Sequence, residues 1–176
     1  MFETERLILR PLDRRDVEPV FAMRKDKNVM RFIREPQNRQ ESINWLKLVS
    51  SRWKDEKIGF CAVLEKRTAA FVGWCGLWRL KETGEIEIGY AIAGKFWGKG
   101  FATEAAARFL RYGFDELNLK KIVAVAAPEN ASSRRVMEKL GLKFVKTGVF
   151  YEKKLVQYAI ERENYKDIQT SENAQA

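Results

Sequence analysis

The chain has 176 residues, 45% of them hydrophobic, and a formal net charge of +9 that is spread along the sequence. This length fits one domain that buries a core without metal or disulfide support. The basic surplus favours anionic partners, or serves only as a solvated basic surface. The chain contains no histidine, which excludes imidazole-based hydrolase triads and most zinc chemistry.

Two cysteines, Cys61 and Cys75, lie in apolar runs and form no C-x-x-C pair. We therefore expect buried thiols in a reducing compartment, and no metal site. The first residues, Met1–Arg6, lack the basic start and long apolar stretch of a signal peptide. No segment approaches the ~18 apolar residues of a membrane span, so the sequence predicts a cytoplasmic protein with no membrane association.

The first third of the chain predicts one strand and two helices. Residues 6–10 read as a strand that ends at Pro11, and Asp13 then has the character of a helix N-cap. A second helix is predicted over residues 40–54, and residues 28–39 are expected to form a loop. The positions at helical spacing are Val17, Val20, Phe21 and Arg24 in the first helix, and Ile43, Leu46, Val49 or Ser50, and Trp53 in the second.

Three segments rich in aromatic and β-branched residues follow, at 58–64, 70–78 and 85–92, with short polar turns between them. Their spacing predicts an antiparallel meander. Side chains alternate along a strand, so in the third segment Glu85, Glu87 and Gly89 are expected on one face. Ile86, Ile88 and Tyr90 are then expected on the other.

The second half predicts a glycine-bearing turn, a helix, a strand, another helix and a hairpin. The strand is expected at 121–127, and Pro128-Glu129-Asn130 opens the second helix, with Gly141 as its left-handed cap. The hairpin is expected at 142–150 and 154–162. We predict one domain over 1–163 and a polar, frayed tail over 164–176. The first helix has Ala102, Ala105, Ala106, Phe109, Leu110, Gly113, Phe114 and Leu117 at steps of three and four.

The turn that enters this helix suits an anion. A helix N-terminus presents unpartnered N–H groups and a partial positive charge, and Gly98 and Gly100 allow close backbone approach. Lys95 and Lys99 add positive charge. The pattern is neither a P-loop nor a dinucleotide fingerprint, which carries a third glycine where Thr103 stands. Alone, the pattern marks a tight strand-to-helix turn more readily than an anion site.

Four ordered blocks make the pattern specific. They are Thr4–Leu12, Glu87–Tyr90, Phe96–Ala105, and Asn130–Ser133 continuing through Glu138–Leu142. In this order they resemble the GNAT acetyltransferase superfamily, and the first block is similar to its RimJ/RimL-like branch of ribosomal-protein N-terminal acetyltransferases. The resemblance implies an α/β fold, α+β in some schemes. It has a mixed, mostly antiparallel sheet, a central pair of splayed parallel strands, and helices on both faces.

The resemblance also implies a co-substrate, acetyl-CoA, in the cleft between the strands at 85–92 and 121–127. The backbone of Tyr90, Ala91 and Ile92 would pair with the pantetheine arm. Asn130 would reach the same arm, or act only as a helix N-cap. The loop that would hold the pyrophosphate is Trp97, Gly98, Lys99, Gly100, Phe101, Ala102 and Thr103, where Trp97 replaces the family's Arg or Gln.

For catalysis, Glu87 is the candidate base, acting through a water, and Glu85 is its rival on the same face. Alternatively, both glutamates lie on a solvated strand face. Many relatives carry a tyrosine acid at the position of Met137, which cannot donate a proton, so Ser133 is the candidate acid. A backbone N–H near Ile92 is the expected oxyanion donor, and Glu104 is expected to serve the helix dipole.

The function predicted is transfer of acetyl from acetyl-CoA to a primary amine by direct attack in a ternary complex. The amine is a protein N-terminus, ribosomal or other, or a small molecule; an α-amine needs less help from a base than lysine does. Alternatives are a coenzyme-binding module without turnover and a basic nucleic-acid-binding domain, the latter unsupported by any recognised motif. The resemblance also implies a homodimer, because members of the family often form dimers. The aromatic residues that form either core or acceptor pocket are Phe32, Trp45, Trp53, Trp74 and Trp78.

Overall fold

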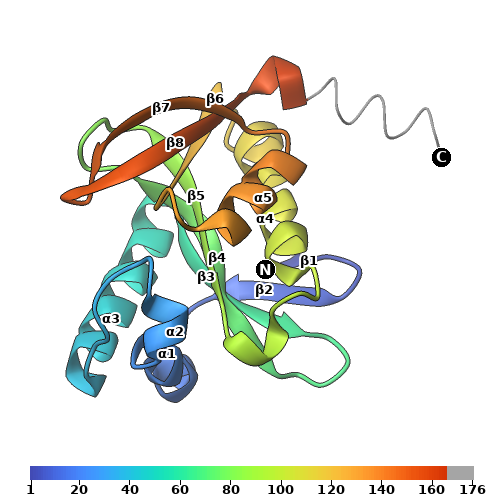
Figure 1. Cartoon of the computed structure of the whole chain (residues 1–176). Helices are drawn as coiled ribbons and strands as arrows, with labels where there is room; N and C mark the ends of the chain where they lie inside the picture. The colour runs from blue at the N-terminus through green and yellow to red at the C-terminus, as the bar shows by residue number, and fades with distance from the viewer. Residues whose placement is uncertain (166–176) are drawn as a thin grey trace.

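The structure is a computed structural model that describes residues 1–165. In this part of the chain the strands form one sheet in the order β1-β2-β3-β4-β5-β6-β8-β7 (Figure 1). All neighbours run antiparallel except β5 and β6, which are parallel. The strands are β1 (Phe2–Glu3), β2 (Leu7–Pro11), β3 (Gly59–Glu65), β4 (Phe71–Arg79), β5 (Ile86–Ile92), β6 (Lys121–Ala126), β7 (Lys143–Phe150) and β8 (Lys153–Glu161).

Helices cover both faces of this sheet, as predicted (Figure 1). One face packs against the first three helices, and the other packs against the last two. This arrangement follows from the strict alternation of side chains along each strand. The helices are α1 (Val17–Arg24), α2 (Lys27–Met30), α3 (Arg39–Glu56), α4 (Phe101–Arg111) and α5 (Ala131–Lys139).

Strand register assigns each residue of the central strands to one of these two faces. Ala62, Trp74 and Ala91 are direct cross-strand partners and pack against α1–α3. Their neighbours Cys61 and Cys75 face α4 and α5. Both cysteines are free and fully buried, as predicted, and burial raises the pKa of the Cys61 thiol to about 12.

The first helices differ in part from the sequence prediction. Residues 28–39 are not simply a loop, because α2 forms within them; the Asp26 carboxylate accepts from the Asn28 and Val29 N–H groups and caps it. Asp13 does act as an N-cap, on a short 3-10 turn that leads into α1. β1, two residues long, was not predicted. The helix that the sequence predicts up to Leu117 is α-helical only as far as Arg111. A π-helical turn over Tyr112–Glu116 follows it.

The end of the described chain forms the predicted hairpin, β7–β8 (Figure 1). Its two-residue turn, Tyr151-Glu152, has left-handed backbone at both positions, with φ of 51° and 61°, the geometry of a type I′ turn. Gly141, the predicted cap of α5, has φ of 82°. The packed chain extends to Tyr165, whose ring lies 4.8 Å from that of Phe114; the remainder of the predicted tail lies outside the described residues.

Among residues 1–165, no helix combines the length and the apolar character that crossing a bilayer requires.

Candidate active site

The two parallel strands diverge soon after they meet. β5 and β6 share one pair of partners, Glu87 and Val123, although each strand continues for several residues beyond it. Alternate residues of a strand direct their N–H and C=O groups to opposite neighbours. Because the Ala93 N–H donates to Val72 at the end next to β4, Tyr90 and Ile92 direct theirs into the opening beside β6. Ala91 directs its groups to β4, so it offers none to the opening.

The glycine-bearing turn lies just beyond this opening, at the start of α4. The backbone N–H of Trp97 donates to Gly94 and that of Glu104 to Gly100. Within residues 1–165, the six N–H groups between them, from Gly98 to Thr103, have no acceptor. Gly98 and Gly100 have φ of 76° and 80°, a conformation that glycine adopts without strain.

The space next to the free N–H groups of the turn is open. A Cβ on Gly98 would meet nothing within 4 Å, and one on Gly100 would meet only the Arg6 guanidinium, at 3.3 Å. The ammonium groups of Lys95 and Lys99 lie 5.1 and 5.2 Å from the ring of Phe96. Free amides, open space and nearby positive charge fit a diphosphate.

Two contacts hold the turn in place. The exposed Trp97 donates its indole N–H to the carbonyl oxygen of Ile92, at 2.6 Å, which ties the turn to the end of β5. The Glu104 carboxylate accepts from Thr4 and pairs with Arg6 at 2.6 Å, and Arg6 donates to the carbonyl of Lys99. Partial burial disfavours ionised Glu104, but these hydrogen bonds outweigh it and lower its pKa. Glu104 is therefore a structural anchor, outside any acid–base role.

The start of α5 reaches the same opening from the α4–α5 face. The Asn130 side chain accepts from the N–H of Ser133 at 3.1 Å, so its predicted N-cap role is confirmed. The hydroxyl of Tyr90 lies 3.1 Å from both the hydroxyl and the carbonyl oxygen of Ser133. Burial raises the pKa of Tyr90, so its phenol keeps its proton. Met137, one turn on, is buried.

Glu87 occupies the opposite face of β5, with α1–α3, and is only 6% exposed. The interpretation of a solvated glutamate is therefore wrong for this residue. Burial raises its pKa to about 7, although a hydrogen bond from the Tyr151 hydroxyl acts in the opposite sense. A carboxyl group that titrates near neutral pH is suited to accepting and releasing protons.

Glu85 has a different environment. Its carboxylate pairs with Lys121 at 2.6 Å and accepts from the Gln157 amide at 2.9 Å. Partial burial favours the neutral carboxyl, but these hydrogen bonds outweigh it and lower the pKa of Glu85. An ion-paired carboxylate with a lowered pKa is a weak base. The geometry thus separates the two glutamates that the sequence left as rivals.

Comparison with known proteins decides the family. Residues 6–143 match the acetyltransferase (GNAT) domain. The chain belongs to the GNAT acetyltransferase family. It is 32% identical over 165 residues to the uncharacterized protein YkkB of Bacillus subtilis (strain 168), covering 92% of this chain and 95% of YkkB. It is 33% identical over 153 residues to the uncharacterized N-acetyltransferase YoaA of the same organism, covering 85% of each.

Solved structures agree with this assignment. A GNAT-family acetyltransferase from Bacillus anthracis superposes with a TM-score of 0.79 and 28% identity, covering 92% of this chain and 98% of that one. The GNAT fold predicted from the four sequence blocks, with its one parallel strand pair in a mostly antiparallel sheet, is confirmed.

The sequence analysis of this GNAT chain missed two side chains. Tyr151, in the hairpin turn, places its hydroxyl on Glu87 from 64 positions away, and no local signal marks it. Tyr90 was expected to act through its backbone, yet its side chain reaches Ser133. Of the aromatic candidates, Trp74 is core and Trp53 packs on Phe2, on the α4 side.

Proposed function

We propose that this GNAT protein transfers the acetyl group of acetyl-CoA to a primary amine by direct attack in a ternary complex. One observation carries the proposal: six backbone N–H groups at the turn into α4 have no acceptor among the described residues, and they lie next to strands that diverge. Glu87 lies on one face of β5, and the Tyr90–Ser133 pair lies on the other. A thioester threaded through the opening would have a base on its acceptor side and a proton donor on its thiol side.

The coenzyme would be held mainly by main-chain groups. The Gly98–Thr103 amides would bind the diphosphate, and Tyr90 would pair with the pantetheine arm in place of a sheet neighbour. The Ile92 carbonyl already accepts from Trp97, so Ile92 would offer only its N–H to the acyl end of the coenzyme. Asn130 is positioned at the same opening, although its side-chain oxygen is engaged in capping. Bound acetyl-CoA supplies an activated acetyl group whose leaving group is a thiolate.

The side chains would divide the proton transfers. Glu87, as carboxylate, would take a proton from the ammonium group through a water, which frees the nitrogen lone pair for attack on the thioester carbon. The Ile92 N–H would stabilise the negative oxygen. As the carbon–sulfur bond breaks, Ser133, supported by Tyr90, would donate a proton to the sulfur. The nitrogen, positively charged after attack, would release its second proton, and this proton would restore the Ser133 hydroxyl, which leaves a neutral amide and a thiol. Met137 lacks a proton to give.

Relatives whose names give an acceptor support an amine as the acceptor of this chain. The acceptors that they name are different. The chain is 29% identical over 134 residues to spermidine N(1)-acetyltransferase of Escherichia coli (strain K12). The match to YdaF of Bacillus subtilis, whose name assigns it to ribosomal N-acetyltransferases, covers 38% of this chain. We propose further that the chain belongs to the RimJ/RimL-like branch of the family.

The direct test measures thiol release from acetyl-CoA with a panel of amines, for wild type, Glu87→Gln and Glu85→Gln. We expect turnover that Glu87→Gln lowers by about 100-fold or more and that Glu85→Gln largely preserves. Binding of coenzyme A without turnover of any amine would favour a binding module. Binding of RNA or DNA that weakens steeply with salt, and no coenzyme binding, would favour the nucleic-acid alternative.

A further inference from the structure

Arg24, near the end of α1, is a buried cation that has no matching anion within residues 1–165. The residue is 2% exposed, and its guanidinium stacks on the ring of Trp45, 4.3 Å from the centroid. Its hydrogen-bond partner in the described chain is the neutral side-chain oxygen of Gln37, and its Nε has none. A buried charge that is neither paired nor fully hydrogen-bonded is costly, so a structural role alone explains it poorly.

The carboxylate whose charge acts on Arg24, that of Glu41, is engaged elsewhere. Glu41 acts on Arg24 only through its charge; its carboxylate accepts from the Asn38 N–H at 2.7 Å, as half of the capping box of α3. Burial, reinforced by the charge of Arg34, lowers the pKa of Arg24 to about 10. The guanidinium is still protonated at neutral pH. Its carboxylate-sized partner is therefore missing from residues 1–165.

Aromatic contacts connect Arg24 to the candidate base. Trp45 packs on Phe60, with ring centroids 5.9 Å apart, and Phe60 stacks on Trp78 at 5.5 Å. Trp78 is the direct cross-strand partner of Glu87. Cross-strand partners share a face, so all of these side chains lie on the α1–α3 side of the sheet. This is the face that an amine would approach.

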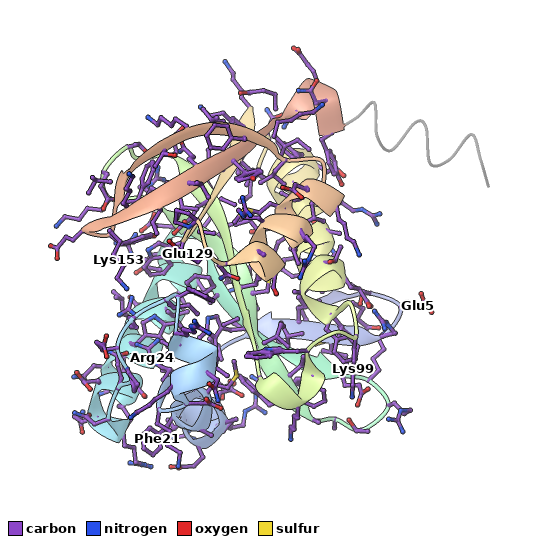
Figure 2. The ribbon with its side chains drawn as sticks, in the orientation of Figure 1. Glu5, Phe21, Arg24, Lys99, Glu129 and Lys153 are labelled. Atoms are coloured by element: carbon purple, nitrogen blue, oxygen red, sulfur yellow. The ribbon has the colours of Figure 1, made fainter. Side chains whose placement is uncertain are left out.

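Residues around the β7–β8 turn provide a second connection between Arg24 and Glu87. Arg34 is close enough for its charge to act on both Arg24 and Tyr151, and the Tyr151 hydroxyl bonds Glu87. Lys153, at the hairpin turn, donates to the carbonyl of Ile33 at 3.1 Å. Figure 2 labels Arg24 and Lys153 on the side of the molecule that carries α1–α3.

The charged residues on this face fall into a positive group and a negative group. Arg24 and Arg34 form the positive group, and Glu87 forms the negative group. Tyr151, which bonds Glu87, also lines a depression of about 440 Å³ together with Lys81, Glu82 and Glu152. We propose that the acceptor is a small amino-carboxylate, whose amine faces Glu87 and whose carboxylate replaces the Gln37 oxygen on Arg24, with Arg34 beside it.

This inference rests on the proposed function and names the substrate class of the same site. An amino-carboxylate fits these charges better than a polyamine, because the second positive charge of a polyamine would lie next to two arginines. The inference also assigns a role to Gln37: its amide oxygen occupies the acceptor-carboxylate position. Bidentate pairing of a guanidinium with a carboxylate supplies both the energy and the orientation.

The test uses amine pairs that differ only in a carboxylate: tryptophan and tryptamine, tyrosine and tyramine, lysine and cadaverine, with spermidine added. For wild type we expect kcat/KM to be at least about 30-fold higher for the carboxylated member of the best pair. Arg24→Gln should reduce that ratio to near one, and the exposed Arg34→Gln should reduce it about twofold to fivefold. Lys139→Gln, which removes the same charge from the exposed end of α5, should leave the ratio unchanged.

A second measurement depends neither on turnover nor on whether the Arg24→Gln variant folds. In the presence of coenzyme A, binding of N-acetyltryptophan and N-acetyltryptamine is compared by calorimetry for wild type and Arg34→Gln. Preference of the wild type for the carboxylated product, reduced in the variant, supports the inference. Equal binding, or faster turnover of decarboxylated amines or spermidine, overturns it and leaves the acetyltransferase proposal standing. Failure of coenzyme A itself to bind would instead overturn the proposed function.

Discussion

Replacing Glu87 by glutamine should stabilise the protein at alkaline pH, even though it removes the proposed base. Glutamine has nearly the shape of the protonated carboxyl group and can still accept the hydrogen bond from Tyr151. The wild-type side chain is 6% exposed, so its negative charge is held in a poorly solvated position at high pH. The variant carries no such charge at any pH.

The pH dependence follows from the two pKa values. Burial raises the pKa of Glu87 from 4.5 to about 7, and one pKa unit is worth about 1.4 kcal/mol, which gives about 3 kcal/mol. Below pH 4.5 the carboxyl is protonated in folded and unfolded chains alike, and this stability is fully present. It is lost as the pH rises from 4.5 to 7, because the unfolded chain ionises over this range while the folded protein still holds its proton; above pH 7 the loss is complete.

Urea unfolding of wild type and Glu87→Gln at several pH values measures this difference. The variant should match the wild type near pH 4.5 and exceed its free energy of unfolding by about 2 to 3 kcal/mol at pH 8. Glu85→Gln is the matched control: its ion pair with Lys121 predicts a loss of stability at pH 8. A stability difference for Glu87→Gln that is constant across pH, or negative at pH 8, would refute the reasoning.

Three further outcomes are expected. Tyr151→Phe removes a hydrogen bond that favours ionised Glu87, so the acidic midpoint of the kcat/KM profile should rise by about one pH unit; an unmoved midpoint contradicts the contact's role. Gly100→Val forces a side chain into backbone at φ of 80° and should weaken coenzyme A binding, measured by calorimetry, by at least about tenfold. Gly84→Val, at another left-handed glycine, should leave that affinity intact; equal losses would count against the turn. Ser133→Ala should lower kcat about 100-fold with unchanged coenzyme affinity, and full activity would remove Ser133 as the acid.

Much of the fold could be predicted because its signals are local. Alternation along 85–92 gives the two faces of β5, and the glycines before α4 mark a turn that needs left-handed backbone. Short elements gave weaker signals: α2 is four residues long and β1 two. Neither is long enough to show a hydrophobic period.

The chemistry of the site could be predicted only in part, because burial and long-range contacts set it. Nothing near Glu87 in the sequence indicates that Tyr151 covers it, since the contact depends on a hairpin turn without the usual glycine or asparagine. Likewise, Lys121 distinguishes Glu85 from Glu87 only through the pairing of β5 with β6. Arg24 did carry a local sign: a charged residue stands among the apolar positions of α1.

The three-residue separation of Glu87 and Tyr90 has a consequence for variation in this strand. An odd separation sends the two side chains through opposite surfaces of the pleated backbone, one toward the amine and one toward the sulfur. Inserting or deleting a single residue between them would bring both to the same surface. Homologous chains that keep this chemistry should therefore keep an even number of residues between these two positions.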